Sequence, residues 1–272
     1  MPGIFLRGIR GVKDLPGEKG QGAKQEKHTI LKDADNGFSD GTTYRETRLT
    51  KAGFYCLKKS LGPLVRGLWI KKVEGLENLP VKGPVIVASN HTSYLDFLCF
   101  VAVSPRNIHY LAAEKFFRSC LWRPLMELSG QIKVDRYNPD KSHAVCQVQS
   151  ALEQGRMVGI FPEGTRSSTG QLGRPFSGVA RFALATEAPV VPVGVIGAHD
   201  VWPRGQALPR LAKEVHIRIG APLSFEDYYG IDHHETHFHE VTALIMSRIW
   251  DLVQCEQALQ PSQPHPLEVP HP

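Results

Sequence analysis

From residue 68 onward, short runs of apolar residues alternate with longer segments in which apolar residues recur with helical spacing. The runs have the length of buried strands, and each intervening segment has the length of a helix. Such alternation predicts an α/β fold, with a mixed, mostly parallel sheet covered by helices on both faces. The predicted strands span residues 69–73, 85–89, 108–112, 157–161, 190–196 and 215–219, and the predicted helices span 93–103, 114–129, 140–154, 177–187 and 237–255.

The chain of 272 residues suits one sizeable domain with a tail at each end. Residues 1–48 are rich in Gly, Lys, Asp and Thr and lack apolar periodicity, so we expect a disordered N-terminal segment. Residues 260–272 are rich in proline and are expected to form a disordered tail. The folded domain is therefore expected to span residues 49–259.

This domain begins with a basic amphipathic segment at residues 51–72. The segment contains six Lys or Arg residues and no Asp or Glu, interleaved with apolar side chains that include Trp69. A helix of this kind can lie in the plane of an anionic membrane surface. The alternative is an ordinary helix that packs on the protein and exposes a basic face. Gly62 and Pro63 argue against one continuous helix here.

Composition indicates the cellular compartment of the protein and the kinds of partner that it can bind. The five cysteines are scattered and never form C-x-x-C, which argues against a disulfide framework and against a zinc module. No apolar stretch reaches the ~18 residues of a spanning helix, and no secretory signal is recognisable. We therefore expect a cytoplasmic protein that is peripheral on the cytoplasmic face of a membrane. The net charge of +5 favours anionic partners, and the lack of a recognisable module argues against nucleic acid.

The first block with chemical potential follows the predicted strand at 85–89, where residues 90–96 read Asn-His-Thr-Ser-Tyr-Leu-Asp. Ser93 followed by Asp96 resembles a capping box with Asp in place of Glu, so a helix is expected to begin at Ser93. The preceding loop can fold His91 over the first helical turn, where Asp96 can accept a hydrogen bond from the imidazole. This pairing would fix the tautomer and leave the other ring nitrogen as a base. The alternative is a loop histidine beside an acid that complements the helix dipole.

A second polar turn follows the fourth predicted strand. Pro162 ends this strand, and Gly164 permits a tight turn. Glu163, Thr165 and Arg166 project from the turn. The planar guanidinium of Arg166 suits a phosphate ligand. The alternative is an ordinary surface turn.

Two weaker blocks are a short strand at 130–136 that ends in Arg136 and an apolar strand at 190–196 that contains Pro192. In this order and spacing, the four blocks resemble those of the glycerolipid acyltransferases, in particular the 1-acylglycerol-3-phosphate acyltransferase family. The matching residues are Asn90, His91, Ser93 and Asp96 of N-H-x-S-x-x-D, Gly130 and Arg136 of the second block, Phe161 to Ser167 of F-P-E-G-T-R-S, and Val191 to Gly194 of V-P-V-G. The resemblance covers residues 65–225 and implies a glycerolipid-acyltransferase-like version of the predicted fold.

The resemblance also implies a role for each block. His91 would be the general base and Asp96 its partner. Residues 163–166 would shape the acceptor site, with Arg166 on a phosphate group, and Arg136 would assist with phosphate or with the acyl donor. The family needs no metal and no cofactor.

This sequence departs from the family at one position. Family members often carry a lysine in an A-K-x-E-L-type stretch after the first helix. Here residues 111–117 read Leu-Ala-Ala-Glu-Lys-Phe-Phe, and Ala113 stands where that lysine would be. Lys115, two residues further on, is the candidate to reach the same space. The departure leaves the exact acceptor open.

The resulting hypothesis is that a fatty acyl chain passes from acyl-CoA or acyl-carrier protein to a hydroxyl of a lysophosphatidate-like glycerolipid, giving phosphatidate in phospholipid biosynthesis. Glycerol 3-phosphate or another lysolipid is the alternative acceptor. Two rival functions stay open: a thioesterase or lipid hydrolase that uses the same base on water, and a non-catalytic lipid-binding protein. The expected partners are the acyl donor, a lysophospholipid acceptor and an anionic membrane surface.

Overall fold

A computed structural model of the chain describes residues 47–135 and 142–254. The strands are β1 (Ile70–Glu74), β2 (Val85–Ser89), β3 (Ile108–Ala113), β4 (Ile132–Val134), β5 (Met157–Ile160), β6 (Val190–Ile196) and β7 (Val215–Ile219). The α-helices are α2 (Arg48–Leu68), α3 (Tyr94–Val103), α4 (Glu114–Arg118), α5 (Arg123–Leu128), α6 (Ser142–Glu153), α7 (Gly178–Thr186), α8 (Ala198–Val201) and α9 (Glu235–Gln254). Short 3-10 helices η1 (Leu76–Asn78) and η2 (Glu226–Tyr228) complete the described part. Of the predicted N-terminal tail (1–48), residues 1–46 lie outside it and residues 47 and 48 are the N-cap and first residue of α2; the predicted tail at 260–272 also lies outside it.

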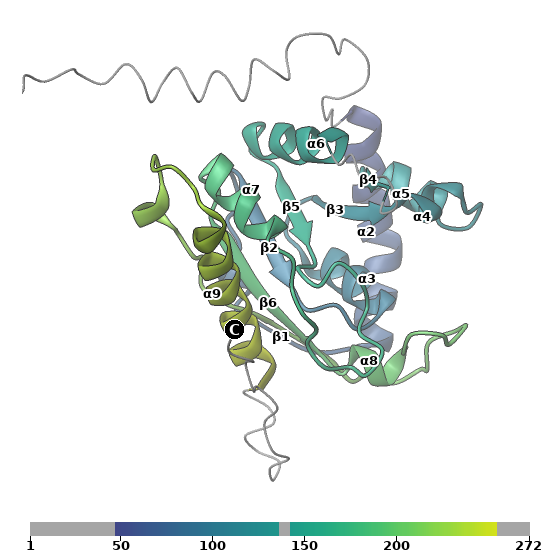
Figure 1. Cartoon of the computed structure of the whole chain (residues 1–272). Coiled ribbons are helices and arrows are strands. Elements are labelled where there is room, and N and C mark those ends of the chain that lie inside the picture. The colour runs from purple at the N-terminus through teal and green to yellow at the C-terminus, as the bar shows by residue number, and fades with distance from the viewer. Residues whose placement is uncertain (1–46, 136–141, 255–272) are drawn as a thin grey trace, which may run out of the picture. The chain divides into compact units, whose positions relative to one another are not determined.

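The seven strands form one sheet in the order β1-β7-β6-β2-β5-β3-β4 (Figure 1). Every neighbouring pair is parallel except β6 and β7, which run antiparallel. The predicted mixed, mostly parallel sheet is therefore confirmed. Ala88 of β2 lies opposite Ile160 of β5, so the loops that follow these two strands leave the same edge of the sheet.

Helices cover both faces of the sheet, as predicted. Because successive strand residues point to opposite faces, Val85 and Val87 of β2 pack in one buried cluster with residues of α2 and α3. Ile86 and Ala88 pack in a second cluster with residues of α6, α7 and α9. Figure 1 shows α6, α7 and α9 on one side of the sheet and α2 and α3 on the other. This double burial explains why β2 reads as an uninterrupted apolar run.

The basic amphipathic segment is one continuous helix, α2, followed directly by β1. The expectation that Gly62 and Pro63 interrupt it was wrong. Gly62 is buried beside Ala102 of α3, where a Cβ would lie 3.9 Å from the Ala102 carbonyl oxygen. The packing of α2 on α3 therefore outweighs the local cost of Pro63. No helix in the described ranges is both long enough and apolar enough to cross a membrane.

The region predicted as one helix at 114–129 is two short helices, α4 and α5. The break falls at residues 119–122, and Pro124 stands in the first turn of α5, a position that needs no backbone N–H donor. The following strand, β4, has three residues, which is shorter than the predicted 130–136. With these two changes, the chain between residues 115 and 134 stays close to the C-terminal end of β3.

Candidate active site

The loop between β2 and α3 carries the predicted histidine and aspartate. Ser93 is the N-cap of α3, and its hydroxyl accepts a hydrogen bond from the Leu95 N–H at 3.1 Å. The carboxylate of Asp96 accepts in return from the Ser93 N–H at 2.8 Å. This is the predicted capping box, and it fixes the first turn of α3 against the end of β2.

His91 and Asp96 make the predicted contact. The Nδ1 atom of His91 lies 2.9 Å from Oδ2 of Asp96, whose side chain is fully buried. The same oxygen accepts from the backbone N–H of Thr92 at 2.7 Å and of Ser93 at 2.8 Å. Three donors therefore hold this carboxylate in one position. A carboxylate at Nδ1 favours the tautomer with the proton on Nδ1, which leaves Nε2 as a base.

The F-P-E-G-T-R-S turn holds His91 from the other side. The ring of Phe161 stacks on the imidazole with a centroid distance of 3.9 Å and an interplanar angle of 12°. Oε1 of Glu163 accepts from the His91 N–H at 2.9 Å, and the Ser167 N–H donates to the His91 carbonyl at 2.7 Å. Two blocks that are 72 positions apart thus form one rigid unit.

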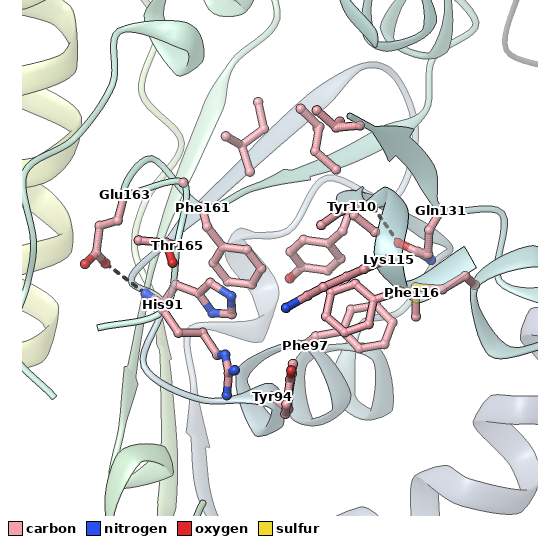
Figure 2. A pocket seen from close by; sticks show the side chains of 18 of the residues that line it. His91, Tyr94, Phe97, Tyr110, Lys115, Phe116, Gln131, Phe161, Glu163 and Thr165 are labelled. Atoms are coloured by element: carbon pink, nitrogen blue, oxygen red, sulfur yellow. Dashed lines mark hydrogen bonds between the residues drawn. The ribbon is translucent and has the colours of Figure 1, made fainter. Parts of the chain in front are cut away.

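Glu163 supports this unit with its carboxylate. Its side chain is buried, and Oε2 accepts from the Gly173 N–H at 2.7 Å. Burial raises the pKa of Glu163, and the two backbone hydrogen bonds oppose the increase. The sequence predicted that Glu163 shapes the acceptor site. Glu163 lines the cavity, and its acceptor-site role stays a prediction. Its carboxylate accepts from the backbone N–H groups of His91 (Figure 2) and Gly173, so it also positions the loop of His91.

A cavity of about 730 Å³ lies beside His91, and it combines apolar and cationic walls. The apolar wall includes Phe97, Tyr110, Phe116, Trp122 and Met126, and the polar wall includes Lys115, Gln131, Thr165, Arg166 and Arg204. Its volume falls in the range of small-molecule sites. A base, several cations and an aromatic surface suit an amphipathic ligand with an anionic headgroup.

Several of the predicted binding residues meet at this cavity. The guanidinium carbon of Arg166 lies 3.7 Å from the centroid of the Tyr94 ring, a stacked contact that holds the guanidinium plane at the cavity wall. Gly164 and Thr165 line the cavity next to it. Gly164 has a φ of 66° and a Cβ there would lie 3.0 Å from the Phe176 ring, so the turn needs glycine.

Lys115 lies at the cavity as well, and Figure 2 shows its ammonium group reaching into the space between His91 and Phe116. Ala113, at the position of the family lysine, also lines the cavity, so the two positions share one space. Arg136 lies outside the described residues, and its predicted role stays a prediction. Val134, two positions earlier, lines the cavity.

The aromatic wall was not predicted. Tyr94 and Phe97 stand three positions apart on α3, and this helical spacing was a usable signal that they share a face. Tyr110 stacks on Phe161 at 5.1 Å, and its backbone N–H donates to Gln131 Oε1 at 2.6 Å. No local pattern relates these residues, because the contacts join different strands and loops.

The fold and the site have the features expected of the acyltransferase class. The family model described as Acyltransferase matches residues 71–196. The chain is 31% identical over 159 residues to the 1-acyl-sn-glycerol-3-phosphate acyltransferase of Bacillus subtilis (strain 168), an alignment that covers 58% of this chain and 75% of that enzyme. The chain belongs to the 1-acyl-sn-glycerol-3-phosphate acyltransferase family.

Other relatives agree with this assignment. The chain is 31% identical over 154 residues to the chloroplastic 1-acyl-sn-glycerol-3-phosphate acyltransferase BAT2 of Brassica napus, covering 56% of this chain and 44% of that enzyme. The alignment with the chloroplastic enzyme LPAT1 of Arabidopsis thaliana is 32% identical and spans 38% of that enzyme. The chain therefore spans less than half of these plant relatives. The crystal structure of the 1-acyl-sn-glycerophosphate acyltransferase PlsC from Thermotoga maritima has the same fold, with a TM-score of 0.61, 20% identity, and coverage of 88% of this chain and 91% of that one.

Proposed function

We propose that the protein transfers a fatty acyl chain from a thioester donor, acyl-CoA or acyl-carrier protein, to the hydroxyl of a lysophosphatidate-like glycerolipid, giving phosphatidate. The observation that carries this proposal is the His91–Asp96 pair, at 2.9 Å, beside a cavity with an aromatic wall and three cations, Lys115, Arg166 and Arg204. The names of the relatives support the same substrate class.

In the proposed reaction, Nε2 of His91 takes the proton of the acceptor hydroxyl as its oxygen attacks the thioester carbonyl carbon. The buried Asp96 carboxylate stabilises the imidazolium that forms and stays ionised. The tetrahedral intermediate then collapses, the carbon–sulfur bond breaks, and the proton leaves with the thiol. The new ester bond replaces the thioester, so no other reactant is consumed.

The transfer is proposed to be direct, without an acyl-enzyme. Of the residues that the structure describes along the cavity, none is Ser or Cys. Among the described lining residues, Thr165 carries the one aliphatic hydroxyl group. A covalent nucleophile would need a side chain within hydrogen-bond reach of the base. Within the described part of the chain, Thr165 makes no hydrogen bond to His91, so the acceptor hydroxyl itself is the proposed nucleophile.

The phosphate of the acceptor is proposed to bind between Arg166 and Lys115. Arg166 offers a planar fork that can bind two phosphate oxygens, and stacking on Tyr94 restricts its motion. Lys115, which lines the same cavity, adds a point charge. Arg136 remains the further candidate for phosphate or donor binding. Glycerol 3-phosphate and other lysolipids share this phosphate chemistry and stay alternative acceptors.

We further propose that the protein works in the cytoplasm as a peripheral protein on the cytoplasmic face of an anionic membrane. The net charge of +5 supports attraction to anionic lipid. A long-chain lysolipid acceptor resides mainly in a bilayer, so the enzyme must meet its substrate at a surface.

The decisive experiment follows thiol release from palmitoyl-CoA and oleoyl-CoA with no acceptor, glycerol 3-phosphate, lysophosphatidate or other lysophospholipids. We expect release that requires lysophosphatidate and is lost in His91→Ala. His239→Ala, which changes an exposed histidine of α9, is the matched control and should behave like the wild type. Release without acceptor would assign a thioesterase. No release from any donor, including acyl-carrier protein, would leave a lipid-binding protein.

A further inference from the structure

Three chain segments border the cavity and form what we call the rim: residues 115–122, 164–176 and 203–213. Each contributes residues to the cavity lining, for example Trp122, Phe176 and Arg204. The three segments come from separate parts of the chain, after β3, after β5 and after α8. The cavity edge is therefore built from three separate chain segments, the first of which includes most of α4.

The segments converge on the ring of Tyr94. Trp122 lies 5.5 Å from this ring, and Trp202, which directly precedes the third segment, lies 5.3 Å from it. The guanidinium of Arg166 from the second segment lies over the same ring at 3.7 Å. The Arg204 guanidinium donates to the Arg166 carbonyl at 3.4 Å. These contacts place the three rim segments around one point.

The rim concentrates exposed apolar side chains. In the described part of the chain, six large apolar side chains are exposed by 69% or more, and four of them belong to the rim. These four are Leu121 at 77%, Phe176 at 69%, Leu208 at 74% and Leu211 at 78%. Such clustering of side chains that gain nothing from water marks a surface that is covered in the working state.

The charged side chains within the three rim segments are all cationic. The segments contain two, two and three Lys or Arg residues and no Asp or Glu, and Arg118 pairs with Glu114, which directly precedes the first segment, at 3.3 Å. Arg118, Arg174 and Arg210 are exposed beside the apolar side chains. Exposed leucines mixed with arginines are the combination that binds the interface of an anionic bilayer, since the leucines enter the acyl boundary while the arginines contact phosphate groups.

The basic face of α2 lies elsewhere. Its groove includes Lys58, Arg66 and Arg106. Arg106 donates to the carbonyls of Gly83 and Gly155, which precede β2 and β5, so this groove lies at the N-terminal end of those strands. His91 and the rim lie at their C-terminal end.

The cations of α2 also have partners within the fold. Lys58 donates to the Ser104 carbonyl and Arg66 to the Ala102 carbonyl, at the C-terminal end of α3. Cations at this position stabilise the end of a helix. Phe54 and Val65 of α2 are buried against the fold, which leaves Leu49, Tyr55 and Leu64 as its exposed large apolar side chains.

We propose that the rim, and not α2, is the surface that binds an anionic bilayer, with the cavity facing the lipid. This inference rests on the proposed function, because a cavity that receives a lysolipid from a bilayer must open toward it. In this orientation the leucines of the rim enter the interface around the cavity edge. The lysolipid phosphate then reaches Arg166 and Lys115 without passing through water.

The test measures co-sedimentation of the full chain with vesicles of phosphatidylcholine and phosphatidylglycerol in equal amounts. The rim variant Leu121→Ser/Leu208→Ser/Leu211→Ser should lower the vesicle partition coefficient by about 100-fold or more. Val81→Ser is the matched control, because Val81 is 76% exposed and precedes β2 at the other end of the sheet. It should bind like the wild type, as should Lys59→Gln in α2. Vesicles of phosphatidylcholine alone should bind the wild type more weakly.

Two outcomes would overturn the proposal. The first is a rim variant that binds vesicles like the wild type while Lys59→Gln loses binding, which would assign the surface to α2. The second is a rim variant whose mass in light scattering drops from dimer to monomer with unchanged vesicle binding, which would assign the rim to a second copy of this chain. Circular dichroism melting should show that all variants fold, since each change is on an exposed side chain.

The proposed reaction can be tested independently of the proposed membrane surface. His91→Ala should bind vesicles like the wild type, because the imidazole is not part of the rim. The rim variant should keep its turnover of a short-chain acceptor dissolved in water and lose turnover of a long-chain acceptor in vesicles. If the wild type transfers to no acceptor but the rim variant still loses vesicle binding, the transferase proposal fails and the membrane surface stands.

Discussion

Replacing Asp96 with Asn tests the charge of this carboxylate apart from its geometry. Oδ2 accepts all three close hydrogen bonds, from His91, Thr92 and Ser93. Oδ1 has a hydroxyl neighbour, Thr92 Oγ1, at 3.4 Å. An Asn side chain can therefore place its carbonyl oxygen in the Oδ2 position and its NH₂ group toward that hydroxyl. The tautomer of His91 is kept in this arrangement, and the negative charge is removed.

The expected fall in kcat of Asp96→Asn follows from the loss of the negative charge beside the imidazolium. Two unit charges at 4 Å near a protein surface interact by about 4 kcal/mol, and a hydrogen bond to a charged group contributes about 1.5–3 kcal/mol. We expect Asp96→Asn to raise the barrier by roughly 3–4 kcal/mol, which lowers kcat by roughly 100- to 1000-fold. Asp96→Ala is less informative, because it leaves two buried backbone N–H groups unpaired at about 1–3 kcal/mol each.

The assay is lysophosphatidate-dependent thiol release, with thermal unfolding measured on the same samples. Asp200→Asn, which changes an exposed aspartate on α8, is the matched control and should keep wild-type activity. Asp96→Asn should unfold within a few degrees of the wild type while its kcat falls. An Asp96→Asn enzyme with activity close to that of the wild type would refute the electrostatic role assigned to Asp96.

Two further predictions concern stability. Gly159→Ala would place a Cβ 2.3 Å from the buried Tyr110 ring, so we expect a loss of about 1–3 kcal/mol in the free energy of unfolding, measured with urea. Hydrogen bonds from Lys72 and Arg218 lower the pKa of Glu74 to about 2. Because this value lies below the usual ~4.3 of an unfolded glutamate, the ionised group stabilises the fold above that pH and the effect is lost as pH falls toward 2. Glu74→Gln should therefore flatten the acid limb of the stability curve.

Each of these changes has a control within the chain. Gly178→Ala adds a Cβ that meets no atom within 4 Å and should leave stability unchanged or slightly higher. Glu77→Gln changes an exposed carboxylate in η1 and should keep the wild-type acid limb. Equal losses in Gly159→Ala and Gly178→Ala would contradict the packing argument, and a parallel acid limb in Glu74→Gln would contradict the assignment to Glu74.

The sequence by itself determined the class of fold and the chemical blocks. Apolar runs of strand length, such as 85–89 and 190–196, predicted strands at the observed positions, because strands buried on both faces need apolar residues throughout. The spacing of Ser93 and Asp96 predicted the start of α3, because a capping box is a local interaction. The contact of Asp96 with His91 followed from the same short loop.

Only the tertiary structure decided how these blocks fit together. Glu163 and Phe161 hold His91 across 70 or more positions of sequence, and no local pattern specifies which atoms meet over such a separation. The same limit applies to α2. Packing on α3 keeps this helix continuous, although Pro63 was expected to interrupt it. In the sequence, the three rim segments fell in a predicted helix (114–129), in and after the F-P-E-G-T-R-S turn, and in a stretch with no predicted element (203–213). Their leucines and arginines became one surface because parallel strands in register release their loops at one edge of the sheet.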